Sequence, residues 1–420
     1  MKAPAHPLAP ASIAFTVLIG TLAALQAMST TVTLPALPGI AAGLETTPAM
    51  AQYTISGFLL GVACGQILSG ALSDHHGRRP VLLAGLAIAV VTGIGCTFAQ
   101  DITTLVALRL VQGFGAAASM ILGRAIIRDA FEGEHALRAM SNMAMVLGVV
   151  PMLGPPLAGL MLEHLSWRWI YGLLTAITLA VGLVTWRRLG ETLRVPDPCA
   201  TDPRRILANC LEMIRTPASI GFVITAYLLY GGIFAYLALI PFIARDSFGL
   251  SASSGGWLVG LSALSIWSGA VINNRLIRGV PVRRMLRAST ALAFGSALAV
   301  LLATLAVTQG WWGPQRAATA GLSCIVGAAM AFCTAFGMTQ SNCIVLSLQP
   351  LAHIAGTASA LGASVQTLCG ALGAWLASRL YDGTPAALGW CMVIAGTLSF
   401  LTFTLVAARY LPAPTADRPS

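Results

Sequence analysis

The chain has 420 residues, of which 57% are hydrophobic and 9% are charged, and it carries a formal net charge of +10. So few charged side chains cannot cover the surface of a soluble globule of this length, which excludes a soluble enzyme or a soluble binding domain. The composition therefore indicates an integral membrane protein.

Apolar runs long enough to cross a bilayer follow one another along almost the whole chain. A hydrocarbon core about 30 Å thick requires about 20 apolar residues per helical span. We predict an all-α membrane protein with twelve transmembrane helices, at 13–34, 48–73, 80–100, 102–127, 139–163, 168–188, 218–244, 251–275, 283–308, 316–342, 355–379 and 386–409.

Most of the basic residues fall on one side of this arrangement. If the N-terminus is cytoplasmic, Arg168, Arg245, Arg316 and Arg379 lie on the other side and Arg109 lies within a span. The positive-inside rule then places both termini in the cytoplasm of a multi-pass protein of the cell inner membrane. The basic charge is explained by this topology, so the lipid bilayer is an expected partner and a nucleic acid is not.

Residues 189–217 interrupt the apolar pattern with charges and prolines. They divide the chain into an N-terminal six-helix bundle at 1–188, a cytoplasmic central linker at 189–217 and a C-terminal six-helix bundle at 218–420. Apolar residues at helical spacing within the linker predict a short amphipathic helix on the inner membrane surface, with a solvated linker as the alternative: Ile206, Leu207, Cys210, Leu211 and Ile214.

The two predicted bundles share a weak internal repeat. At an offset close to 200 residues, Gly70 aligns with Gly269 and Asp74 aligns with Asn274, and a basic turn follows each. Two pseudo-symmetric six-helix bundles in parallel repeat are the architecture of transporters that rock about a site between their halves. We therefore expect a secondary transporter that acts as a monomer.

The loop between the second and third spans has the sequence GALSDHHGRRP. Gly77 can adopt the positive φ of a tight turn, and Arg78 and Arg79 can stay among lipid headgroups. Gly70 allows close helix approach, while Asp74 could contact a helix N-terminus or a basic side chain of the other bundle in one conformation only. This contact would act as a conformational latch.

Several motifs carry a family resemblance across the chain. GALSDHHGRR resembles the loop signature of the major facilitator superfamily, LRLVQGFGAAASMILGRAIIRDAF resembles its fourth-span motif, and GVVPMLGPPLAG resembles its fifth-span motif associated with antiporters. With LPALP, SWRWIYGLL and ETL, the chain is similar to Bcr/CflA-type drug-resistance transporters. The resemblance implies export of a small, often amphipathic drug or metabolite by proton antiport. It marks a conformational switch at Gly70, Asp74, Gly77, Arg78, Arg79, Arg124, Arg128 and Asp129.

Polar and aromatic side chains within the spans indicate a substrate cavity. Arg109 lies about seven residues into the fourth span, where an unpaired charge is costly, so it should face the bundle interior. Gln112 shares its helix face, and a structural role for Arg109, bonded to carbonyls, is the alternative. The expected cavity residues, some of which could equally be packing residues or interfacial anchors, are Gln26, Thr30, Thr31, Tyr53, Arg109, Gln112, Tyr227, Tyr230, Phe234 and Trp267.

The fifth predicted span concentrates residues that weaken a helix. We expect a kinked gate helix there, carried by Gly148, Pro151, Gly154, Pro155 and Gly159.

No acid or histidine lies clearly in the middle of a span. Members of the family commonly place an aspartate four residues before the proline of LPALP, and this chain has Thr31 there. Either Glu163 or Asp74 at a span's edge titrates, or the protein is a facilitator or exchanger of a small metabolite or metal ion without proton coupling. Without a carboxylate pair, histidine cluster or activated nucleophile, we expect no enzyme activity, no cofactor and no metal site.

Overall fold

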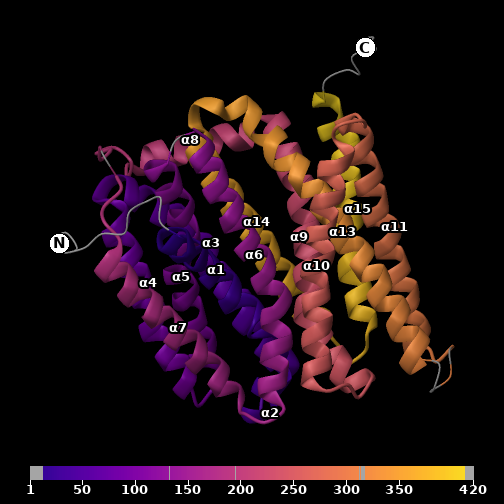
Figure 1. Ribbon diagram of the computed structural model, residues 1–420. Helices are drawn as coiled ribbons and strands as arrows, with labels where there is room; N and C mark the ends of the chain where they lie inside the picture. Colours follow the sequence, from indigo (N-terminus) through magenta and orange to yellow (C-terminus); the bar gives the residue numbers. More distant parts are fainter. Residues whose placement is uncertain (1–12, 132, 194, 312, 314–316, 412–420) are drawn as a thin grey trace.

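The computed structural model describes residues 13–131, 133–193, 195–311, 313 and 317–411, and these are helical, with no β-strand among them (Figure 1). Twelve helical segments within the described residues are long and apolar enough to cross a membrane. The predicted all-α fold with twelve spans is therefore confirmed. Arg316 and both chain ends lie outside the described residues.

The first half of the chain contributes six long helices and two short ones. The long helices are α1 (Ile13–Thr31), α3 (Pro48–His76), α4 (Arg78–Phe98), α5 (Ile102–Ala130), α6 (Gly133–Leu162) and α7 (Trp167–Arg188). The 3₁₀-helix η1 (Leu34–Ala36) and α2 (Leu37–Gly43) continue α1 beyond its end.

The second half repeats this pattern after a linker helix, α8 (Pro203–Arg215). Its long helices are α9 (Pro217–Phe242), α10 (Ala252–Leu276), α11 (Val282–Thr308), α13 (Leu322–Leu348), α14 (Ala355–Leu380) and α15 (Ala386–Leu405). Short turns of helix connect or extend them at η2 (Ile243–Ser247), η3 (Ala317–Gly321), η4 (Gln349–Ile354) and η5 (Ala407–Tyr410).

Helix starts follow from local capping chemistry. Asp101 accepts a hydrogen bond from the backbone N–H of Thr104 at 2.8 Å, and Thr47 accepts one from Met50 at 3.2 Å, so each caps the helix that follows it. Between α3 and α4, Gly77 has φ = +100°, which explains the tight turn that the sequence predicts there.

The two ends of the bundle are distinguished by short helices. In Figure 1, α8 lies across one end, which we call the linker face, and α2 lies at the other end, which we call the opposite face. The apolar residues Leu207 and Ile214 of α8 are each 59% exposed, whereas Met213 is buried. The amphipathic helix expected in the linker thus forms, and it directs Met213 into the protein.

Glycine contacts relate the two halves. A Cβ added to Gly113 of α5 would lie 2.0 Å from the Phe58 carbonyl oxygen of α3, and one added to Gly337 of α13 would lie 2.1 Å from the Ile266 carbonyl oxygen of α10. Both helix pairs therefore require glycine at the crossing. In the same crossings, Gly61 of α3 meets the backbone of Leu110 and Gly269 of α10 meets that of Thr334.

These contacts correct the register of the repeat. They pair Gly269 with Gly61, about two helical turns from the Gly70 that the sequence alignment chose. A Cβ at Gly70 would meet no atom within 4 Å, so the letters shared by the two loops do not mark equivalent packing positions.

The hydrophobic core is shared near the opposite face and divided near the linker face. The largest buried cluster joins Leu34, Ile40 and Ile55 of the first half to Ile233 and Ile240 of the second. The next two clusters are separate: one contains residues from 15 to 189, and the other contains residues from 213 to 411 with Ile67 at its margin. The two halves therefore share a hydrophobic core near the opposite face and have separate cores near the linker face.

Candidate functional site

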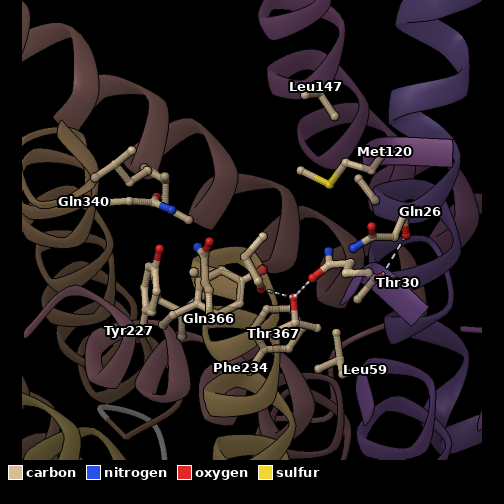
Figure 2. Close-up of a pocket in the computed structure, with 18 of the residues that line it drawn as sticks. Gln26, Thr30, Leu59, Met120, Leu147, Tyr227, Phe234, Gln340, Gln366 and Thr367 are labelled. Atoms are coloured by element: carbon tan, nitrogen blue, oxygen red, sulfur yellow. Dashed lines mark hydrogen bonds between the residues drawn. The ribbon is translucent and has the colours of Figure 1, made fainter. Parts of the chain in front are cut away.

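A cavity of about 310 Å³ lies between the two halves. Helices α1, α3, α5 and α6 line it from the first half, and α8, α9, α10, α13 and α14 line it from the second. Figure 2 shows side chains of both halves facing this space. Its polar lining includes Gln26, Thr30, Thr31, Gln66, Arg124, Tyr227, Ser262, Gln340, Gln366 and Thr367.

Aromatic and aliphatic side chains make up the deeper part of the cavity. The Tyr230 ring centroid lies 4.8 Å from that of Phe234 and 5.6 Å from that of Phe336. Leu59 of α3 faces them from the first half. Because Phe234 is seven residues further along α9 than Tyr227, it lies about 10 Å nearer the opposite face.

Two glutamines of the first half present hydrogen-bonding groups to the cavity. Gln66 accepts a hydrogen bond from the Thr367 hydroxyl at 3.4 Å, and this bond joins the two halves across the cavity. Gln26 Oε1 is buried with no partner among the described residues. An orphaned acceptor in a cavity wall is available to a ligand donor or a water.

A second cavity, of about 580 Å³, lies at the linker face. It shares Arg124 and Ser359 with the central cavity, so the two are adjacent. Its walls come from the turn after α3, from the linker and from the start of α14, and they include Asp74, Arg78, Arg128, Asp197, Arg205, His353 and Gly356. The central cavity thus adjoins the linker face, while the shared core closes it from the opposite face.

Most of the predicted switch residues form one charge cluster within the first half. Arg78 pairs with the carboxylates of Asp74 and Asp129, the latter at 2.9 Å, and donates to the Ser73 hydroxyl at 2.7 Å. Arg79 donates from Nη2 to the Trp186 carbonyl at 2.7 Å. In this conformation Asp74 is held within its own half.

Glu191, which the sequence analysis did not assign to the site, caps this cluster. Its carboxylate accepts hydrogen bonds from the backbone N–H groups of Arg78 at 2.8 Å and Arg79 at 3.1 Å, at the N-terminus of α4. A carboxylate is favourable at a helix N-terminus. The ETL motif was the available signal, but only the fold brings residue 191 to residue 78.

The linker adds a second tie to the same turn. The backbone N–H of Asp197 donates to the Asp74 carbonyl at 2.9 Å. The backbone N–H of Cys199 and the guanidinium of Arg205, which is 2.7 Å from the carboxylate, lower the pKa of Asp197. The carboxylate of Asp197 is thus bonded within the linker, while its backbone N–H joins the linker to α3.

Arg109 does not line the central cavity. Its side chain is fully buried and donates to the carbonyls of Ser29 at 2.9 Å and Thr54 at 3.4 Å and to Gln112 Oε1 at 2.8 Å. The Phe58 ring centroid lies 4.0 Å from its guanidinium carbon. These contacts tie α1, α3 and α5 together.

Three other predicted cavity residues also lie elsewhere. Gln112 belongs to the Arg109 group, and neither Tyr53 nor Trp267 lines the cavity. Trp267 is 56% exposed and lies on the outer side of α10 beside Gly148. An aromatic residue within a span can lie either in the cavity lining or on the outer side of its helix, so periodicity could not show which of the two holds Trp267. The predicted residues that the structure brings together in the lining are Gln26, Thr30, Thr31, Tyr227, Tyr230 and Phe234.

The predicted gate helix α6 packs on α10 of the other half. It runs as one helix through Pro151, Pro155 and Pro156, and Pro151 lines the cavity. Because proline has no backbone N–H, Pro156 cannot donate the usual helical hydrogen bond to the Met152 carbonyl. A Cβ added to Gly260 of α10 would lie 2.5 Å from that carbonyl oxygen, so the two backbones meet directly. The remaining glycines of the gate motif, Gly154 and Gly159, meet Val32 and the backbone of Ala252.

The family of the chain follows from comparison with known proteins. The model of the Major Facilitator Superfamily matches residues 19–374. The chain belongs to this superfamily, as the sequence motifs predicted. Since the family and its relatives are transporters, the chain is a transporter and not an enzyme.

Curated relatives align over nearly the whole chain. The chain is 29% identical to the uncharacterized MFS-type transporter YdgK of Bacillus subtilis (strain 168), covering 95% of this chain and 96% of the relative. It is 25% identical to the bicyclomycin resistance protein homolog of Haemophilus influenzae, with 94% and 97% covered. It is 27% identical to multidrug resistance protein D of Escherichia coli (strain K12), with 92% and 94% covered. The predicted Bcr/CflA resemblance is confirmed.

A solved structure shows the same fold. A bacterial homolog of the human lysosomal transporter Spinster aligns with a TM-score of 0.70 at 16% identity, covering 95% of this chain and 98% of the other.

Proposed function

We propose that this protein exports small amphipathic molecules across the cell inner membrane by alternating access. The observation that carries the proposal is the central cavity between two pseudo-symmetric halves, which combines polar side chains with an aromatic part nearer the opposite face. The basic residues favour a cytoplasmic linker face, so the cavity adjoins the side from which an exporter loads. The names of two relatives, a bicyclomycin resistance homolog and a multidrug resistance protein, support a drug-like substrate.

The conformational change that this function needs is a rocking of the two halves. Outward opening must separate α6 from α10, and inward closing must bring the α3–α4 turn to the start of α14. Asp74 and Gly356 line the linker-face cavity from opposite halves. We assign Asp74 the role of a latch that leaves Arg78 and engages the N-terminus of α14 when that cavity closes.

The source of energy is open to two mechanisms, and one observation favours the second. Proton antiport is implied by the family resemblance. However, no carboxylate or imidazole is among the described residues that line the central cavity, where Thr31 stands in place of the usual aspartate. Transport without direct proton coupling, as a facilitator or an exchanger, is therefore the second candidate.

The experiment begins with purified protein in liposomes and a neutral fluorescent dye. We expect dye to move across the membrane only when protein is present, and drug accumulation to fall in efflux-deficient cells that express it. Failure of the protein to move any of a panel of drugs and dyes, in both systems, would reject the proposal. Cysteine labelling from each side of the membrane tests the orientation in the same preparations.

A further inference from the structure

Arg124 of α5 is a cation that has no hydrogen-bond or ion-pair partner in the part of the chain that the structure describes. It lies six residues before the end of a membrane-length helix and lines both cavities. None of the hydrogen bonds or ion pairs found among the described residues involves its guanidinium, although a group of this kind within a span is costly to leave unpaired. Its five N–H donors are available to a bound molecule or to water.

The acids at the linker-face end of the molecule pair with other basic residues. Asp74 and Asp129 both pair with Arg78. Asp197 pairs with Arg205 at 2.7 Å, and Glu212 of α8 lies 2.8 Å from His353. In this conformation none of these four carboxylates pairs with Arg124.

Neutral polar groups of the other half line the same cavity as Arg124. Tyr227 of α9 lines the central cavity together with Arg124. Figure 2 shows the Tyr227 hydroxyl together with Gln340 of α13 and Gln366 of α14 on one side of the cavity. A guanidinium, a phenol and two amides that line one cavity offer it several hydrogen-bond donors, and donors of this kind bind a carboxylate or sulfonate.

The apolar part of the cavity lies deeper than this group. Tyr230, Phe234 and Leu59 lie toward the opposite face, and Phe234 is about 10 Å beyond Tyr227 along α9. We propose that the preferred substrates are amphipathic organic anions, with the acidic group on Arg124 and the apolar body against Tyr230 and Phe234. This inference rests on the proposed export function and specifies its substrate class.

The test uses three probes of nearly equal shape and different charge. These are tritiated 2-naphthoate, 2-naphthamide and 2-naphthylmethylammonium, bound to purified protein in detergent and measured by scintillation proximity. The wild type should bind the anion more tightly than the amide, and the amide more tightly than the cation. Arg124→Gln should weaken naphthoate binding about tenfold to a hundredfold, the usual size of a charged hydrogen bond, and leave naphthamide binding unchanged.

Two variants serve as controls. Arg128→Gln removes a cation one helical turn away whose side chain is 62% exposed and which lines the linker-face cavity alone, so naphthoate binding should change little. Arg124→Lys keeps the charge without the planar donor pair and should recover part of the affinity. Naphthamide binding reports that each variant is folded.

Each other outcome overturns the inference. The anion site is rejected if the wild type binds naphthoate and naphthamide equally tightly, or if Arg124→Gln binds naphthoate as tightly as the wild type. In either case, continued naphthamide binding and dye transport would still support the export function. Equal loss of both probes in Arg124→Gln would assign Arg124 to the fold. Binding of no probe, together with no dye transport in liposomes, contradicts the export function as well.

Discussion

Arg109 and Arg124 lie on the same helix, about 22 Å apart along its axis, in opposite surroundings. Around Arg109, two backbone carbonyls, a glutamine and an aromatic ring leave no space for a ligand. Around Arg124, two cavities meet, and none of the ion pairs among the described residues involves this arginine. Helix α5 thus carries one arginine that joins helices and one that faces the cavity.

The difference shows what a charge within a span can do. Carbonyls can hold a guanidinium without any acid, because each accepts a hydrogen bond in a medium of low dielectric. Such an arginine stabilises the wall of the cavity. An arginine whose donors stay unused keeps its hydrogen-bonding capacity for a ligand, and its removal should cost the fold little. Loss of Arg109 should therefore lower the stability of the protein, whereas loss of Arg124 should weaken ligand binding.

The largest effect is expected at the structural arginine. Arg109→Ala should lower the free energy of unfolding by about 3 kcal/mol or more, because it leaves several buried acceptors unpaired at about 1–3 kcal/mol each. Arg124→Ala should leave stability near the wild-type level. Thermal stability measured by fluorescence-detected size exclusion compares the two variants. If Arg109→Ala keeps wild-type stability and loses transport, Arg109 acts in the cycle and the contrast between the regions fails.

The next effect tests the closed side of the molecule. Gly260→Ala would place a Cβ 2.5 Å from the Met152 carbonyl oxygen, so α6 and α10 must separate at a cost of about 1–3 kcal/mol. The variant should shift the protein toward opening at the opposite face. Gly255→Ala is the control, because its Cβ would meet no atom within 4 Å.

The measurement for these glycine variants is cysteine accessibility. Leu237→Cys places a thiol in the cavity lining, in a background without the native cysteines. A membrane-impermeant reagent added at the opposite face should label it faster in Gly260→Ala than in Gly255→Ala. Equal labelling would show that the α6–α10 contact does not hold this side closed.

A smaller effect is expected at the latch. Asp74→Asn should slow the transport cycle about tenfold, or about 1.4 kcal/mol, while affinity in detergent stays constant. Arg78 retains Asp129 at 2.9 Å, so the cluster should survive. Asp197→Asn, which removes an exposed ion pair, is the control and should change the rate less. Lost affinity with a normal cycling rate would mean that Asp74 has no part in switching.

Much of the fold could be predicted because the signals are local. Span length depends on consecutive apolar residues, and the turn at Gly77 depends on one residue's conformational freedom. The two halves place glycines at matching helix crossings, but the register of the repeat depended on which glycines meet there. That contact lies between helices, so the alignment of loops placed it about two turns away.

The site was harder to predict because a span does not show which of its faces meets the cavity. Arg109 and Arg124 both interrupt apolar sequence, and only the packing of α1 and α3 around one of them separates their environments. Gln340 and Gln366 were missed, although a glutamine within an apolar run is itself a signal. Trp267 was placed in the cavity because aromatic residues also line it.

The last prediction concerns energy coupling, where the expected change is smallest. Thr31 lines the cavity, and its hydroxyl donates to the Ala27 carbonyl at 2.9 Å. An aliphatic hydroxyl does not titrate near neutral pH, so Thr31 cannot load and release a proton during transport. If the substrate is an anion, an inside-negative potential drives export by about 2.3 kcal/mol per charge at 100 mV, and no proton is needed. Wild-type export in liposomes should therefore follow a potassium diffusion potential and persist when the pH is the same on both sides of the membrane.

Thr31→Asp should add a dependence on the pH gradient, because a partly dehydrated carboxylate has a raised pKa and can load and release a proton as access alternates. Thr31→Asn has the same size without a titratable group, so it should behave like the wild type. Both variants and the wild type are compared at a clamped potential, with and without a pH gradient. Uphill export by the wild type that is driven by the pH gradient alone and abolished by nigericin would show that the protein couples to protons through a residue outside this cavity.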